Sequence, residues 1–296
     1  MSKNGFLLCT LLAAAPGWGR PATPTAGLIV PAAHPLITVE VNGHPLRLKV
    51  DLGAHGGIIL NPQAAARAGL AKDRPVTMRI GPVKLRGSRA SPTFALGGVR
   101  WKDEVMWFDR SYVADADGVV GPHHLPFAEV AFEGPGPGNR NFSVEARHSD
   151  ERGVFVPMRV AGKKVAVRFS LLRPRSFATG SAGALLARQQ GGRLDRAVIQ
   201  QHLGWDISRP TRRLSMEVPW RVGVFSIGDI LVRLRDYRGK SVLPTAEAEA
   251  GPEDILVRGQ VRRQGAEHFL TVGLDQLHNC QSVTYSRLAK QLSFRC

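Results

Sequence analysis

Apolar and polar residues alternate along two stretches of this chain, which predicts that both stretches form β-strands. The apolar positions are Leu46, Leu48 and Val50 in the first stretch, and Val165, Val167 and Phe169 in the second. A valine, a small or polar residue and a glycine precede each stretch, at residues 41–43 and 160–162. Such triplets are typical of tight turns between paired strands, so the pattern predicts two similar β-hairpins.

These two hairpins belong to a longer internal repeat. Residues 39–60 align with residues 158–179 without a gap, and a short Ala-rich segment that ends in glycine follows each copy, predicting a short helix. Further matches pair residues 94–99 with 225–230, and residues 118–125 with 270–277. Because the matches recur in the same order, they predict two homologous lobes, the second of which carries an insertion of mostly basic loops.

The predicted lobes cover residues 35–133 and 153–296. Residues 134–152 lie between them and are rich in glycine, proline and charge, which is typical of a linker. The chain has 296 residues, enough for two domains, and its 32 glycines and 20 prolines favour many turns and short strands. We therefore expect an all-β fold with short helices.

The N-terminal segment predicts export. Residues 1–19 combine Lys3 with an apolar run that is too short to cross a bilayer as a helix, which is typical of a secretory signal peptide. The cleavage site stays open, and a buried N-terminal helix is the alternative. In a periplasmic or extracellular protein, Cys280 and Cys296 would be the remaining cysteines and become candidates for a disulfide, with two unrelated thiols as the alternative.

The charge is strongly basic, with a formal net charge of +16 that lies mostly in the second half of the chain. Basic runs at residues 209–214 and 233–240 fit an acidic partner or an anionic envelope surface, although solvated strand faces and loops are the favoured interpretation. We predict no nucleic-acid partner, because the chain has no nucleic-acid-binding motif and its N-terminus indicates export. The oligomeric state stays open.

Residues 50–54 (Val-Asp-Leu-Gly-Ala) resemble the active-site loop of retropepsin-like and pepsin-like aspartic proteases, and so do the helix, flap-like hairpin and apolar-apolar-Gly segment that follow. This resemblance implies a bilobal all-β protein of two β-barrel lobes, a peptide-sized interlobe cleft and one aspartate per lobe. Two carboxylates about 3 Å apart share one proton, so one acts as base and the other as acid. The resemblance makes Asp51, Gly53 and Ala54 the candidate catalytic loop, with Asp51 as an ordinary turn residue as the alternative.

The sequence departs from that family at decisive positions. Leu52 replaces the usual hydroxyl residue after the aspartate, and in the second copy Ser170 occupies the position of the aspartate itself. If the lobes pair as in the family, Arg173 and Arg175 bring positive charge near Asp51, from which we expect a lowered pKa. Together with His55, these arginines are the candidate residues of the cleft.

The leading hypothesis is an exported, catalytically impaired protein that binds a peptide or protein segment in the interlobe cleft. The alternative is an active aspartic endopeptidase that uses Asp51 and completes its pair of carboxyls through a second chain. We predict no cofactor and no metal: Asp51, His55, His123 and His124 could approach one another, but their spacing fits no metal-binding motif.

Overall fold

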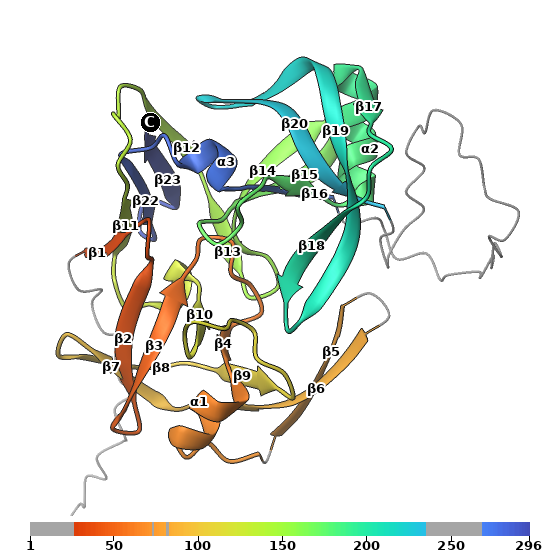
Figure 1. The fold of residues 1–296 in the computed structure, drawn as a ribbon. Helices are drawn as coiled ribbons and strands as arrows, with labels where there is room; N and C mark the ends of the chain where they lie inside the picture. The colour runs from red at the N-terminus through yellow and green to blue at the C-terminus, as the bar shows by residue number, and fades with distance from the viewer. Residues whose placement is uncertain (1–26, 73, 81–82, 235–267) are drawn as a thin grey trace, which may run out of the picture.

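The computed structural model describes residues 27–72, 74–80, 83–234 and 268–296, and most of its regular structure is β (Figure 1). It has the all-β, bilobal fold that the pattern predicted. The predicted signal peptide at 1–19 and the part of the basic run beyond residue 234 lie outside the described residues. None of the described helices combines the length and apolar character needed to span a membrane.

The first lobe is built on a nine-stranded sheet in the order β5-β6-β9-β4-β10-β3-β2-β7-β8. Its strands are β2 (Leu36–Val41), β3 (His44–Val50), β4 (Ile58–Leu60), β5 (Arg74–Ile80), β6 (Val83–Ala90), β7 (Thr93–Leu96), β8 (Val99–Lys102), β9 (Val105–Phe108) and β10 (Gly118–Val120). Strands β2 and β3 form the first predicted hairpin, and the alternating residues of β3 are buried in the core.

The second lobe has its own nine-stranded sheet, in which β18 pairs with β19 beside the main path β13-β14-β15-β21-β16-β20-β19-β17. Its strands are β13 (Arg147–Ser149), β14 (Gly153–Val160), β15 (Lys163–Phe169), β16 (Phe177–Ala178), β17 (Gly192–Leu194), β18 (Ile199–Gly204), β19 (Ile207–Val222), β20 (Phe225–Arg233) and β21 (Phe269–Val272). Strands β14 and β15 form the second predicted hairpin.

The internal repeat is visible in the strand pairing of the two lobes. In the first lobe β10 lies parallel to β3 and antiparallel to β4, and β4 lies parallel to β9. In the second lobe β21 lies parallel to β15 and antiparallel to β16, and β16 lies parallel to β20. The two lobes therefore share one topology around the ends of β3 and β15, where Asp51 and Ser170 follow.

The Ala-rich segments form the predicted helices α1 (Pro62–Arg67) and α2 (Gly180–Gln190). Thr179 caps α2 by accepting a hydrogen bond from the Ala182 amide, and the helix ends at Gly191 in the left-handed conformation, with a φ of 66°. The apolar-apolar-Gly segments lead into the 3-10 helix η1 (Pro122–His124) in the first lobe and into α3 (Leu274–Leu277) in the second.

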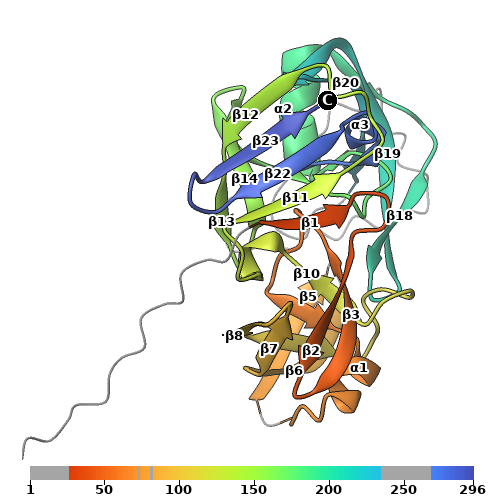
Figure 2. The same cartoon turned by 90° about the vertical axis from the view of Figure 1, so that its left-hand side faces the viewer.

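A third sheet joins the lobes, which the sequence pattern alone did not indicate. It has five strands in the order β1-β11-β22-β23-β12 and faces the viewer in Figure 2. These strands are β1 (Leu28–Pro31), β11 (Glu129–Glu133), β12 (Asn141–Glu145), β22 (Ser282–Ser286) and β23 (Gln291–Arg295). Strands β12 and β13 lie within the segment predicted to be a linker. This segment therefore connects the lobes and also contributes one strand to the five-stranded sheet and one to the sheet of the second lobe.

Candidate interlobe site

The Asp51 loop of the first lobe packs directly against the Ser170 loop of the second. The Asp51 amide donates to the Val120 carbonyl at 3.0 Å, and the Ser170 amide donates to the Val272 carbonyl at 2.9 Å, so both loops begin in the same way. A Cβ on Gly53 would come within 2.9 Å of the Phe169 carbonyl oxygen. The loops thus approach closely enough that only glycine fits at this position.

The carboxylate of Asp51 is held by the second lobe. Ser170 Oγ donates to Asp51 Oδ2 at 2.9 Å, and the Leu171 amide donates to Asp51 Oδ1 at 2.8 Å. The Leu172 amide donates in turn to Ser170 Oγ at 3.2 Å. Asp51 is only 6% exposed and Ser170 2%, so this link is buried between the lobes. Ser170 therefore occupies, in the second lobe, the position that Asp51 has in the first, and its hydroxyl binds the Asp51 carboxylate.

Burial raises the pKa of Asp51 above 3.8. The hydrogen bonds from Ser170 and Leu171 and the charge of Arg173 oppose this shift, but the loss of hydration outweighs them. The expectation of a lowered pKa was therefore wrong. It counted the nearby positive charge and did not include the cost of enclosing a carboxylate.

Arg173 and Arg175 have other partners than the ones expected. The Arg173 guanidinium donates to the carbonyls of His202 and Leu203, at 2.5 and 2.9 Å, and so connects the Ser170 loop to β18. Arg175 forms an ion pair with Asp229 at 2.8 Å within the second lobe. Of the two arginines, only Arg173 contributes to the electrostatic environment of Asp51 described above.

His55 lies beside Arg168, a buried arginine that reaches across from β15. Arg168 Nη1 lies 3.2 Å from His55 Nδ1, and the guanidinium packs over the Phe269 ring at 4.5 Å. His55 Nδ1 also lies 3.1 Å from the Gly53 carbonyl oxygen, so the tautomer decides whether Nδ1 accepts from Arg168 or donates to Gly53. His55 keeps part of its surface in solvent, but loss of hydration around the ring, followed by the charge of Arg168, lowers its pKa to about 3.

The hairpin of β18 and β19 reaches from the second lobe onto the first (Figure 1). Trp205 at its tip packs edge-on against Phe108, with ring centroids 5.7 Å apart, and lies 4.3 Å from the ring of Tyr112. It forms an apolar cluster with Ile59 and Leu85 of the first lobe. The second lobe thus covers part of the first with its own side chains.

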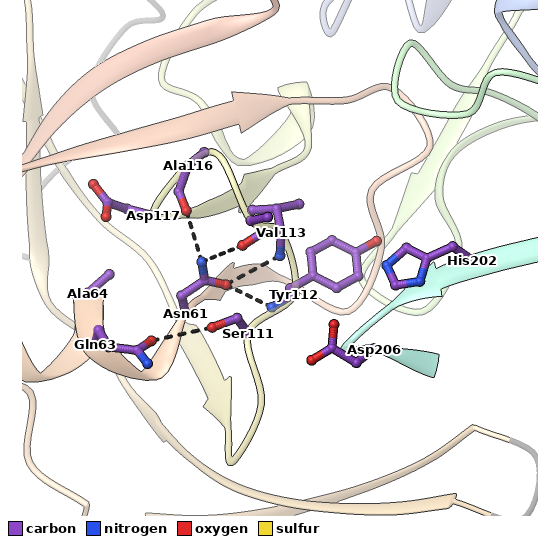
Figure 3. A pocket seen from close by; sticks show the side chains of 11 residues that line it. Asn61, Gln63, Ala64, Ser111, Tyr112, Val113, Ala116, Asp117, His202 and Asp206 are labelled. Atoms are coloured by element: carbon purple, nitrogen blue, oxygen red, sulfur yellow. Dashed lines mark hydrogen bonds between the residues drawn. The ribbon is translucent and has the colours of Figure 1, made fainter. Parts of the chain in front are cut away.

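A cavity of about 480 Å³ lies next to this hairpin, between the lobes. Figure 3 shows Asn61 at its edge, holding the loop before β10: the side-chain amide donates to the carbonyls of Val113 and Ala116, and its oxygen accepts from the Tyr112 amide. Asp206 and His202 contribute the wall from the second lobe. The cavity is therefore lined by both lobes and offers polar groups from each.

His123 and His124 do not join Asp51 and His55 in one group. They lie on η1, where their rings are 4.1 Å apart, and the ring of His123 is 5.5 Å from that of His148. Burial, followed by the positive charge that neighbouring groups can carry, lowers the pKa of His123 to about 2. The two histidines therefore form a separate group near the start of the second lobe.

Several residues of the interlobe contact were missed by sequence reasoning. Trp205, Tyr112, Arg168 and Asn61 were not assigned to the site. The alignment of the two copies places Arg168 opposite Lys49, two positions before the aspartate, which could have drawn attention to it. Trp205 and Tyr112 meet across the lobes, and Asn61 bonds a loop that is distant in the chain, so none of these contacts leaves a local sequence pattern.

The structure joins Cys280 and Cys296 by a disulfide across a sequence separation of 16 residues. Cys296 follows β23, and Cys280 precedes β22. The bond thus closes the C-terminal hairpin of the interlobe sheet.

Residues 37–122 match the model of a family described as aspartyl protease. This segment runs from β2 to η1 and contains Asp51, Gly53 and Ala54. The first lobe is thus similar to this family, as the motif in residues 50–54 predicted. No curated protein matches the chain.

Solved structures also include similar proteins. A retropepsin-like aspartic protease from Rickettsia conorii is 18% identical, with a TM-score of 0.23, and the match covers 29% of this chain and 63% of that protein. The EIAV protease complexed with the inhibitor HBY-793 is 20% identical, with a TM-score of 0.24, and the match covers 30% of this chain and 83% of that protein.

Proposed function

We propose that this protein is an exported, non-hydrolytic relative of the aspartic proteases that binds a peptide or protein segment between its lobes. The hydrogen bond from Ser170 to Asp51 carries the proposal. Hydrolysis by this family needs two carboxyl groups that share a proton, so that one activates water while the other polarises the substrate carbonyl. A serine hydroxyl does not ionise in the acidic range where such a pair works.

The environment of Asp51 supports the same conclusion. Both carboxylate oxygens accept hydrogen bonds from the second lobe, and the residue is almost fully buried. A second chain that supplied its own aspartate would have to displace Ser170 and Leu171 from these positions. This favours the non-hydrolytic function over an endopeptidase completed by dimerisation.

The interlobe cavity supports the binding of a peptide segment. Its volume lies within the usual range of ligand sites, about 300–1,000 Å³. Side chains from both lobes line it, and Asp206 adds a carboxylate that favours hydrogen-bond donors or basic groups in the bound segment. The Cys280–Cys296 disulfide supports export, because such bonds persist in oxidising compartments.

The first experiment tests hydrolysis. The purified protein and its Asp51→Asn variant are incubated with a denatured protein mixture from about pH 3 to about pH 8, with a working aspartic protease as positive control. We expect no cleavage by either form. Cleavage by the wild-type protein that is absent from Asp51→Asn would overturn the non-hydrolytic assignment.

A second experiment tests binding. A random peptide library displayed on phage is selected on the immobilised wild-type protein, and the enriched peptides are measured on Asp206→Lys and on Asp195→Lys. Asp195 is an exposed aspartate outside the cavity lining, so its variant is a matched control for charge. We expect binding to weaken only in Asp206→Lys. Equal binding to all three proteins, or no enrichment on wild type, would contradict peptide binding in this cavity.

A further inference from the structure

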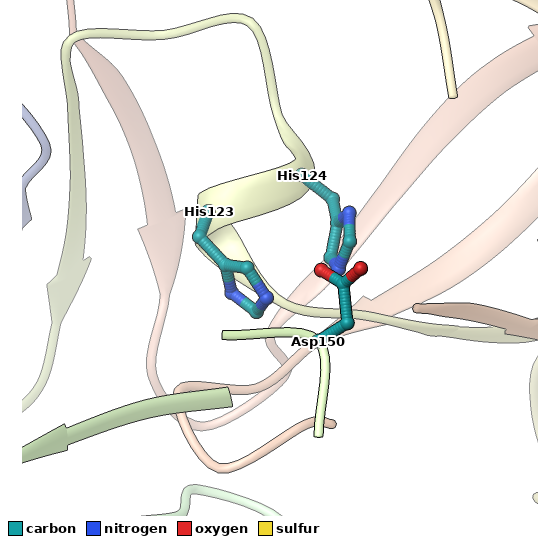
Figure 4. A group of neighbouring side chains, drawn as sticks. All are labelled: His123, His124 and Asp150. Atoms are coloured by element: carbon teal, nitrogen blue, oxygen red, sulfur yellow. The ribbon is translucent and has the colours of Figure 1, made fainter. Parts of the chain in front are cut away.

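His123, His124 and Asp150 form a group in which the two histidines and the carboxylate converge (Figure 4). One potential ligand atom from each residue lies within 4.8 Å of the others. The histidines end η1 of the first lobe, and Asp150 lies in the turn between β13 and β14. The group therefore brings together two segments that are distant in the chain, because β11, β12 and β13 lie between them.

Three of the four imidazole nitrogens of this group are buried without hydrogen bonds within the described residues. His123 is 9% exposed, and neither of its ring nitrogens has a partner within the described part of the chain. The side chain of His124 is 8% exposed, and its Nε2 is likewise unpartnered there. Buried polar atoms are nearly always hydrogen-bonded, so such nitrogens indicate a group that binds them.

His124 is also oriented as metal-binding histidines commonly are. Its Nδ1 lies 2.9 Å from Asp103 Oδ2, and donation from Nδ1 to this carboxylate leaves the Nε2 lone pair directed into the group. In many zinc sites a carboxylate that accepts from the other ring nitrogen holds the orientation of the imidazole and increases its basicity. Asp103 is therefore suited to the role of a supporting residue behind His124.

The backbone fixes the turn that carries Asp150. The Gly56 amide donates to the Asp150 carbonyl, and a Cβ on Gly153 would lie 2.2 Å from the Ala54 carbonyl oxygen. The turn is thus packed against the loop that contains Asp51. Asp150 keeps an exposed side chain, so its carboxylate can turn towards the histidines without unfolding the turn.

We propose that His123, His124 and Asp150 bind one divalent transition-metal ion of the zinc class. Two imidazole nitrogens and one carboxylate oxygen are ligands that Zn²⁺ favours, and a set of three leaves the fourth position for water. The positive Arg287 also faces the group, but its guanidinium donates to the carbonyls of His123 and Leu125. The carboxylates of Asp150 and Asp103 offset that charge.

A metal ion at this place would connect the first lobe to the turn that begins the second. It would stabilise the native protein, because the unfolded chain does not hold the three ligands together. The site is separate from Asp51 and from the cavity beside Trp205. Its test is therefore independent of the proposed peptide binding.

The experiment uses the full protein without an added histidine tag, freed of metal by chelation. Zn²⁺ binding is measured by calorimetry, and Co²⁺ binding by its visible absorption. We expect one ion per chain, a raised melting temperature, and binding that is weakened about tenfold or more in His124→Ala and in Asp150→Asn. Asp150→Asn is the safer variant for folding, because its side chain is exposed.

Two controls decide whether binding is specific. His44→Ala removes an exposed histidine at the start of β3 and should bind Zn²⁺ as the wild type does. Asp103→Asn should weaken binding by about 10–100-fold while leaving the direct ligands in place. Absence of stoichiometric binding, or binding that is equal in wild type, His124→Ala and Asp150→Asn, would overturn the proposal.

Discussion

Ser170 Oγ donates a hydrogen bond to Asp51 Oδ2 at 2.9 Å, across the buried contact between the two lobes. In chain order and topology, this pair occupies the place of the two aspartates in the proteases that the sequence resembles. Asp51 supplies a carboxylate, and Ser170 supplies a hydroxyl. The contact therefore links the two loops through one acid rather than two.

Removing the Ser170 hydroxyl should destabilise the protein. Ser170→Ala leaves a buried carboxylate oxygen without its donor, at an expected cost of about 1–3 kcal/mol in the free energy of unfolding, measured by urea denaturation. Ser170→Asp instead places two carboxylates about 3 Å apart, so we expect it to be less stable at neutral pH than at about pH 4. A Ser170→Asp protein whose stability, relative to wild type, does not change over this range would contradict the close pairing.

The raised pKa of Asp51 predicts a specific pH dependence. Because the native state holds the proton more tightly than the unfolded state, this group favours folding most below the unfolded pKa of about 3.8. That contribution is lost as the pH rises through the higher native pKa. Asp51→Asn does not titrate, so the unfolding free energy of wild type minus that of the variant should fall between about pH 4 and neutral pH. A difference that grows with pH would show a lowered pKa instead.

His55 should titrate far below ordinary histidines. Its pKa is lowered to about 3, and Arg168 is the second cause after loss of hydration. We expect Arg168→Met to raise the pKa of His55, because it removes the adjacent positive charge. The measurement is a pH titration of the His55 ring signals by NMR, with His55→Asn to assign them. A wild-type His55 pKa near 6.5 would contradict this contact. So would an Arg168→Met variant in which the pKa of His55 is the same as in the wild type.

The Trp205 contact should contribute strongly to the association of the lobes. Trp205→Ala removes a buried indole from the apolar cluster around Phe108 and should cost about 3–5 kcal/mol of stability. Val218 is a matched control, because it is 61% exposed and its change to alanine should cost little. Urea denaturation of both variants checks the prediction, and equal stability of the two would contradict it.

The Cys280–Cys296 disulfide should stabilise the interlobe sheet. A loop of this length is expected to contribute about 3 kcal/mol, mainly by restricting the unfolded chain. Cys296→Ser should therefore lower the urea midpoint, and a reductant should lower the wild-type midpoint to a similar value. A wild-type midpoint that the reductant leaves unchanged would argue against the bond, even if Cys296→Ser has a lower midpoint.

The sequence by itself determined the local structure and the repeat. Alternation predicted β3 and β15, the turn residues predicted their hairpins, and the gapless alignment placed Ser170 opposite Asp51 before any contact was known. These features depend on neighbouring residues and on a side-chain period of two, which a single sequence records directly.

Only the tertiary structure decided how the two lobes meet. The five-stranded sheet, the Trp205 contact and the group of His123, His124 and Asp150 join segments that are distant in the chain. The pKa of Asp51 was predicted in the wrong direction, because charges can be counted from a sequence but loss of hydration depends on what covers the group. Folding brings Ser170 and Leu171 over the carboxylate, and that enclosure sets the chemistry of the site.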